Sequence, residues 1–130
     1  MTLLLDTSLL IDIERKFPPT IARLKELSKT YPLPARITVV NEFEFLLGIQ
    51  EKSPKNKEKA VAFLNNFTVL QTTKQTAGIL TNLKHKYDKK GIVLSLADLL
   101  IASLAIENNR ILVTKDHDFK EIEELRIISV

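Results

Sequence analysis

Acidic side chains that interrupt short apolar segments are the residues of this sequence best suited to chemistry. Asp6 ends the run LLLD, Glu44 interrupts FEFLLG, Asp98 lies within SLADLLIASLA, and Asp116 follows ILVTK. Burying a carboxylate is costly unless a positive group shares its site, and two unit charges about 4 Å apart repel by about 4 kcal/mol at an effective dielectric constant of about 20. If the four side chains converge, their repulsion requires a cation, and oxygen ligands suit Mg²⁺ or Mn²⁺. The pattern therefore indicates a metal-dependent enzyme that acts on phosphate esters.

The composition narrows the classes of protein that fit. At 130 residues the chain is predicted to form one domain spanning residues 1–130, and 45% apolar with 27% charged residues is typical of a globular protein. The absence of cysteine excludes thiol catalysis and Cys-based zinc sites, and two histidines disfavour a His-rich metal site. A net charge of +3 is compatible with a polyanionic partner but also with a solvated, lysine-rich surface. No signal peptide or membrane-spanning stretch is recognisable, which predicts a cytoplasmic location.

The segments that must position the acids alternate between strand and helix patterns. This alternation predicts a three-layer α/β/α fold around a parallel sheet, whose sites lie beyond the carboxyl ends of the strands. Asp6 and Asp116 each come soon after a predicted strand. The predicted strands are residues 2–5, 36–38, 67–70, 111–113 and 126–129; the predicted helices are residues 8–15, 20–29, 39–50, 59–64, 74–89, 95–109 and 119–125, with a turn at 31–34 and a polar loop at 52–57.

Asp98 has a structural and a functional interpretation. Ser95 and Asp98 have the spacing of a capping box, in which the acid only bonds back to the start of its own helix. Its helical neighbours three, four and seven residues on are Ile101, Ala102 and Ala105, which places Asp98 on the inward face. We favour the functional interpretation, because an inward carboxylate near a helix start suits a metal site better than a solvent-exposed cap.

The other acids also have structural alternatives. Asp6 occupies a position typical of a helix cap, and Asp116 and Asp118 that of an Asx turn. Glu44 lies on a mostly apolar helix face, but Glu42 is two residues away, and periodicity does not separate the two. A fold of this class brings strand ends and helix starts to a common crevice. A shared metal site therefore explains the four acids together better than a separate structural role for each.

The first half of the chain resembles the PIN domain family, and within it the small VapC-type toxin ribonucleases. LLLDTSLLID resembles the opening strand and acidic motif of the family, with Asp6 in the acidic position and Ser8 in place of the usual Asn. ITVVNEFEFLLG resembles the segment whose acid lies four residues before a glycine. That spacing selects Glu44 over Glu42, with Gly48 as the glycine.

The second half continues the resemblance in the same order. LADLLIASLAIENNRILVT resembles the third acidic helix and its following strand, and it carries Asp98. TKDHDF resembles the closing segment of the family, so Thr114 and Asp116 carry over, with Asp118 as an accessory acid. The ordered set spans nearly the whole chain, which makes it more specific than any one motif.

The resemblance implies a five-stranded parallel sheet and a Mg²⁺- or Mn²⁺-dependent endoribonuclease. It also implies a homodimer and a cognate VapB-type antitoxin that blocks the active site. For the dimer we expect a contribution from the helix that contains Ile79, Leu80 and Leu83. The implied metal ligands are Asp6, Glu44, Asp98, Asp116 and Asp118; Thr114 is expected to position a water or phosphate oxygen, and Lys115, Arg110 and Arg15 are candidates for neutralising RNA phosphates.

Other functions were weighed against the same residues. A haloacid-dehalogenase-type phosphatase needs a second acid at position 8, which is Ser8, and a receiver domain needs an acceptor Asp after the third strand, where residues 71–73 supply none. A PIN nuclease in RNA processing without an antitoxin stays open, as does a non-catalytic binding descendant, although all four acids are present. A lysine run at positions 84, 86, 89 and 90 is interpreted as a solvated helix face in preference to an RNA track.

Overall fold

A five-stranded parallel sheet forms the middle of the molecule. The computed structural model describes residues 2–32 and 34–130. The strands follow the spatial order β3-β2-β1-β4-β5, and every neighbouring pair is parallel, which confirms the predicted sheet. Their bounds are β1 (Leu3–Leu5), β2 (Arg36–Thr38), β3 (Thr68–Leu70), β4 (Ile111–Thr114) and β5 (Ile127–Ser129).

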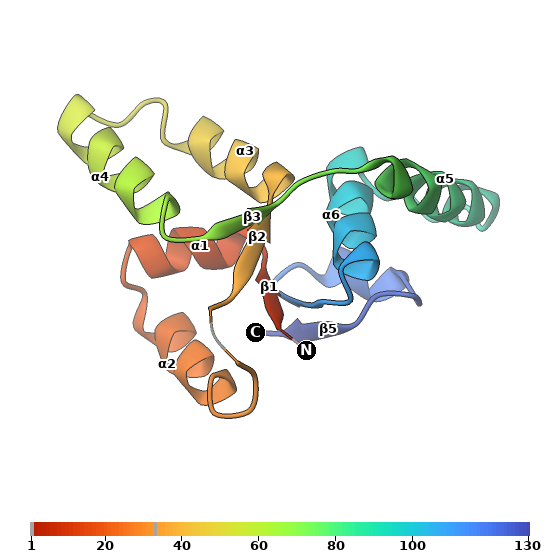
Figure 1. The fold of residues 1–130 in the computed structure, drawn as a ribbon, viewed down its shortest axis with the longest axis horizontal. Helices are drawn as coiled ribbons and strands as arrows, with labels where there is room; N and C mark the ends of the chain where they lie inside the picture. The colour runs from red at the N-terminus through yellow and green to blue at the C-terminus, as the bar shows by residue number, and fades with distance from the viewer. Residues whose placement is uncertain (1, 33) are drawn as a thin grey trace.

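Helices cover both faces of this sheet. Figure 1 shows α1 to α4 on one side of the strands and α5 and α6 on the other, which confirms the predicted three-layer α/β/α fold. The helices are α1 (Thr7–Glu14), α2 (Pro18–Leu27), α3 (Val39–Gly48), α4 (Pro54–Leu64), α5 (Lys74–Lys89) and α6 (Leu96–Glu107), and a short 3-10 helix η1 (His117–Glu121) precedes β5.

The alternation of side chains along β1 divides the interior into two cores. Leu3 and Leu5 pack into the core under α1 to α4, whereas Leu4 packs into the core under α5 and α6. All three side chains are at most 3% exposed, as expected for an apolar strand at the centre of a parallel sheet. Because both faces are filled, the chain first meets polar surroundings where β1 ends, at Asp6.

Some predicted boundaries differ from the observed ones. The helix expected at residues 59–64 begins earlier, at Pro54, because Ser53 Oγ accepts the backbone N–H of Asn56 and the proline fits the first turn. The helix expected at residues 119–125 is the 3-10 helix His117–Glu121. The expected turn at residues 31–34 includes Leu33, which lies outside the described residues.

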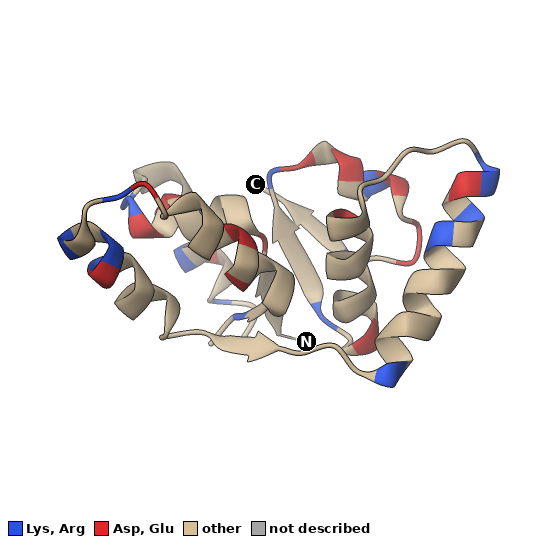
Figure 2. Ribbon diagram, turned by 90° about the horizontal axis from the view of Figure 1, so that it is seen from above, with Lys and Arg blue, Asp and Glu red and all other residues tan. Residues whose placement is uncertain are grey.

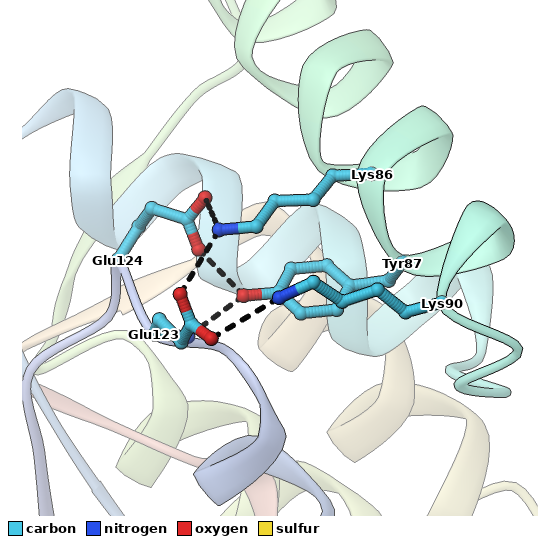
Figure 3. Close-up of polar contacts among 5 residues, drawn as sticks. All are labelled: Lys86, Tyr87, Lys90, Glu123 and Glu124. Atoms are coloured by element: carbon cyan, nitrogen blue, oxygen red, sulfur yellow. Dashed lines mark hydrogen bonds and ion pairs between the residues drawn. The ribbon is translucent and has the colours of Figure 1, made fainter.

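A cluster of five polar side chains ties the end of α5 to the chain after η1 (Figure 3). The Tyr87 hydroxyl donates to Glu124 Oε1 at 2.6 Å and accepts the backbone N–H of Glu123 at 2.8 Å. Lys86 contacts Glu123 and Glu124 at 3.2 and 3.1 Å, and Lys90 contacts Glu123 at 3.1 Å. Tyr87 is 1% exposed, so this cluster anchors the chain that leads from η1 into β5.

The lysine run on α5 is largely paired with acids. Lys84 contacts Asp88 at 2.8 Å, and Lys86 and Lys90 share Glu123. Figure 2 shows basic and acidic segments together toward the end of α5. This agrees with the interpretation of a solvated helix face. None of the helices in the described part of the chain combines the length and apolar character needed to cross a bilayer.

The Tyr87 anchor generates a stability prediction. Replacing Tyr87 with Phe removes the hydroxyl and leaves the Glu123 N–H and the Glu124 carboxylate short of a partner, so we expect a loss of about 1–3 kcal/mol in the free energy of unfolding. Urea denaturation measures this change. As the control, Lys84→Ala removes only an exposed pair within one helix and should change stability by less than about 0.5 kcal/mol. Equal effects of the two variants would contradict the anchor.

Candidate metal-binding active site

The carboxyl ends of β1 and β4 bring Asp6 and Asp116 to one edge of the sheet. The two strands are neighbours in register, with Leu5 opposite Val113, so the residues that follow them emerge side by side. Asp6 is the N-cap residue of α1, yet its side chain forms no capping hydrogen bond. The helix-cap alternative for Asp6 is therefore not observed, and its carboxylate makes other contacts.

Asp6 is buried among polar groups and other acids. Its Oδ2 accepts a 2.7 Å hydrogen bond from Thr114 Oγ1, and its Oδ1 lies 3.4 Å from Asn41 Nδ2. Burial raises the pKa of Asp6, the bond from Thr114 lowers it, and the negative charges of Glu44 and Asp116 raise it further. The net pKa is raised, so the ionised form of Asp6 is disfavoured in the absence of a cation.

Asp98 reaches the same group of charges from α6. The cap of that helix is formed by Ser95 Oγ, which accepts the backbone N–H of Asp98 at 3.0 Å. Burial raises the pKa of Asp98 to about 6. A hydrogen bond between the Ser95 and Asp98 side chains opposes this rise, and the negative charges of Asp116, Asp6 and Asp118 add to it. The helix start is thus capped while the Asp98 carboxyl responds to the acids across the site.

Three carboxylates lie close enough to share an ion. One oxygen from each of Asp98, Asp116 and Asp118 lies within 4.8 Å of the others. Asp116 Oδ1 also accepts the backbone N–H of Asp118 at 2.9 Å, which is the expected Asx turn. The turn and the acidic cluster are therefore compatible: the hydrogen bond of the turn holds Asp116 and Asp118 next to each other, facing Asp98.

Glu44 is joined to the site through Thr7. Glu44 Oε1 accepts a 2.6 Å hydrogen bond from Thr7 Oγ1, which connects α3 to the first residue of α1. The charge of Glu44 also acts on the neighbouring Asp6. The structure thus places Glu44 near Asp6, in agreement with the choice of Glu44 over Glu42.

Two residues of this network, Thr7 and Asn41, were not identified in the sequence. Asn41 is 0% exposed, and its Nδ2 lies 3.0 Å from Thr7 Oγ1. The hydroxyl of Ser8, which replaces the usual Asn, is buried and has no hydrogen-bond partner among the described residues. Amide support for the acids therefore comes from Asn41. The available signal was a polar residue three positions before Glu44, on the same inward helix face.

Thr114, which we expected to position a water or phosphate oxygen, forms hydrogen bonds with residues of the acidic site. It is 0% exposed, its hydroxyl donates to Asp6, and its oxygen accepts the backbone N–H of Asp116 at 3.0 Å. A hydroxyl proton committed to Asp6 is not available to a water or a phosphate oxygen. Thr114 therefore orients two acids of the site.

Two of the basic candidates for RNA contacts are placed differently from the expectation. Lys115 Nζ lies 2.6 Å from Asp12 Oδ2 and over the ring of Phe17 at 5.2 Å. Although burial raises the pKa of Asp12, hydrogen bonds from Lys115 and Thr20 lower it overall. Arg110 precedes β4 and so lies at the opposite edge of the sheet from the acids, because β4 runs from Ile111 to Thr114.

The donor set of this edge fits a hard divalent cation. All the charged groups that converge are carboxylates, which Mg²⁺ and Mn²⁺ prefer over nitrogen and sulfur ligands. Burial, with a smaller contribution from the neighbouring negative charges, raises the pKa of Asp6 and Asp98, so their ionised forms are disfavoured in the protein alone. A bound cation would offset the cost of ionising these carboxylates. The residues present therefore fit the divalent metal that the sequence implies.

Comparisons with known proteins agree with the fold. The PIN domain family model matches residues 3–125. Ribonuclease VapC of Rickettsia bellii is 32% identical over 136 residues, covering 100% of this chain and 97% of that protein, and Ribonuclease VapC2 of Rickettsia felis is 28% identical over 127 residues, covering 96% and 95%. The structure of VapBC2 from Rickettsia felis bound to a DNA fragment from their promoter contains a chain with a TM-score of 0.86 and 26% identity, covering 100% of this chain and 99% of that one.

The family match spans almost the entire chain, and both relatives align with it from end to end. The acids at the carboxyl edge of the sheet come from segments that lie inside the matched region, from Asp6 to Asp118. On these grounds the chain belongs to the PIN domain family.

Proposed function

We propose that this protein is a divalent-metal-dependent endoribonuclease and the toxin of a VapBC-type toxin–antitoxin pair. The observation that carries the proposal is the approach of Asp98, Asp116 and Asp118 to within 4.8 Å beside the buried Asp6. Its relatives over the full length are ribonucleases by name, which supports the same reaction. A nuclease that hydrolyses RNA phosphodiester bonds is the function that this chemistry and this ancestry favour together.

The acids divide the work of holding the metal. We assign Asp6, Asp98 and Asp116 as ligands, directly or through water, with Glu44 and Asp118 completing the negative site. When bound, Mg²⁺ or Mn²⁺ lowers the pKa of a water molecule and neutralises charge on the scissile phosphate. The chain's own contribution is to fix the carboxylates, since Thr114 holds Asp6 and Asp116 together while Thr7 holds Glu44.

The proposed partners are an RNA substrate, a VapB-type antitoxin and a second copy of the chain. The residues Ile79, Leu80 and Leu83, which we expected to contribute to a dimer, pack into the chain's own core under α5 and α6. Exposed apolar side chains lie instead along α3 and at the start of α6, where Phe43 and Leu96 line one groove and are 61% and 63% exposed. Apolar surface of this kind marks interaction sites, so we propose that a partner chain, the antitoxin or a second copy, covers this groove. One domain over residues 1–130 and a cytoplasmic location stay predictions.

Cleavage of an RNA pool by the purified protein tests the proposed function. We expect cleavage with Mn²⁺ or Mg²⁺ and none with EDTA. Glu44→Gln keeps the acceptor for Thr7 but removes the charge beside Asp6, so it should reduce the rate by about 10–100-fold, the range seen when supporting groups of metal sites are lost. Glu42→Gln, the same change two residues away and on a different face of α3, should be nearly silent. Cleavage that survives EDTA, or the opposite ranking of the two variants, would contradict the proposal.

The raised pKa of Asp98 predicts how the metal-free protein responds to pH. Because the folded-state pKa is about 6 against an ordinary value of 3.8, the folded protein binds this proton more tightly than the unfolded chain. This contribution to stability is fully present below about pH 4 and is lost as the pH rises through 6. In EDTA, Asp98→Asn should therefore match the wild type near pH 4 and melt higher at pH 7.5.

The expected rise in Tm at pH 7.5 is about 2–4 °C, which corresponds to about 1 kcal/mol after allowance for solvent screening. Scanning calorimetry or thermal circular dichroism at both pH values measures it. Asp88→Asn serves as the control, because Asp88 is exposed and paired with Lys84, and its loss should give no rise. A lower Tm for Asp98→Asn at pH 7.5 would mean that its charge is compensated within the metal-free protein.

A further inference from the structure

Asn41 forms more hydrogen bonds than a helix cap requires. It occupies the third position of α3, and its Oδ1 accepts both the backbone N–H of Thr38 at 2.9 Å and the hydroxyl of Thr38 at 2.7 Å. These bonds, together with the Thr38 hydroxyl that accepts the Asn41 N–H at 3.1 Å, complete the capping box. The amide nitrogen of Asn41 takes no part in the cap and points to the acidic site.

The orientation of this amide is fixed by its partners. Two donors from Thr38 meet the same atom, which must therefore be the oxygen, and the nitrogen necessarily faces the other way. Nδ2 lies 3.0 Å from Thr7 Oγ1 and 3.4 Å from Asp6 Oδ1. An amide supplies an acceptor on one side and donors on the other, whereas a carboxylate at position 41 would present only acceptors to Asp6.

The hydrogen bond from Asn41 determines what the Thr7 hydroxyl does. Because Thr7 Oγ1 accepts a hydrogen bond from the Asn41 amide, its own O–H is directed to Glu44 Oε1, at 2.6 Å. Thr7 is thus held between Asn41 and Glu44, which lie one helical turn apart on α3. This arrangement fixes the residue next to Asp6 against α3 and selects which oxygen of Glu44 remains for other ligands.

We propose that Asn41 is a positioning residue of the metal site, acting through Thr7 on Glu44. The proposal rests on the proposed function in that Glu44 and Asp6 belong to the metal-binding group. Asn41 touches neither substrate nor metal in this account. The Oδ1 atom of Asn41 completes the cap of α3, while its Nδ2 supports Glu44 of the same helix through Thr7.

A double-mutant cycle on Mn²⁺ affinity tests this proposal. The dissociation constant is measured from the electron paramagnetic resonance signal of free Mn²⁺, without RNA, on protein shown to be folded by circular dichroism. Thr7→Val should weaken Mn²⁺ binding about 10-fold in the wild-type background, as for other supporting groups of metal sites. In the Asn41→Ala background the same Thr7→Val change should have less than about a 2-fold effect, because the connection is already broken. Independent, multiplicative effects of the two changes would overturn the proposal.

Two further variants separate positioning from a merely structural role. Asn41→Asp keeps the acceptor for the Thr38 N–H, so it preserves the cap if Asn41→Ala does not fold, and Thr7→Val should again have no effect in its background. Thr76 is the corresponding cap residue of α5, where its hydroxyl accepts the Thr73 N–H. Thr76→Ala should lower the Tm but leave Mn²⁺ affinity unchanged. An equal loss of Mn²⁺ affinity in Thr76→Ala and Asn41→Ala would mean that Asn41 acts only as a helix cap.

The RNA cleavage assay keeps this proposal distinct from the proposed function. A wild-type protein that binds Mn²⁺ but does not cleave RNA would refute the nuclease, while the Mn²⁺ cycle would still decide the role of Asn41. For an active wild type, Asn41→Ala should raise the Mn²⁺ concentration for half-maximal cleavage by about 10-fold, with a smaller change in kcat at saturating Mn²⁺. The reverse split, with kcat alone reduced, would contradict positioning of a metal-binding acid.

Discussion

Repulsion among carboxylates at one edge of the sheet is the constraint on which this structure depends. Parallel pairing of β1 with β4 obliges the chain to leave both strands at the same place, and acids follow at each exit. Burial first, and the negative charges of the neighbouring acids in addition, raise the pKa of Asp6 and Asp98 in the absence of a cation. The two apolar cores on either side of β1 offset the cost of this arrangement, and under our proposal a divalent metal relieves it.

Neutral hydroxyls and an amide hold the acids in place without adding charge. Thr114 connects Asp6 to the chain that carries Asp116, and Thr7 connects the start of α1 to Glu44. Each of these groups donates to a carboxylate, which favours the ionised form, and each is fixed by another hydrogen bond on its far side. Asp6 and Glu44 of the proposed metal site are therefore oriented by hydrogen bonds within the protein itself.

The strands, the layer arrangement and the acidic positions could be predicted from the sequence because they depend on local pattern. Asp6 after LLL and Asp116 after ILVT mark strand ends, and the spacing of Glu44 and Gly48 distinguished the acid of α3 through the family resemblance. The support for these acids could not be predicted, because Asn41 meets Asp6 and Thr7 only after 34 or more residues of intervening chain have folded. Arg110 was a poorly chosen candidate for an RNA contact, because the predicted strand at residues 111–113 already places it at the amino end of the strand, away from the acids.

Equilibrium binding of Mn²⁺ tests most directly whether these acids form one metal site. Isothermal titration of the wild-type protein and of Asp6→Asn, at pH 7.5 and without RNA, compares the same fold with and without the central carboxylate. We expect saturable binding to the wild type and its loss in Asp6→Asn, since the charges of both Glu44 and Asp116 act on that carboxylate. Equal Mn²⁺ binding by the two proteins would contradict the account, because the ion would then be held elsewhere.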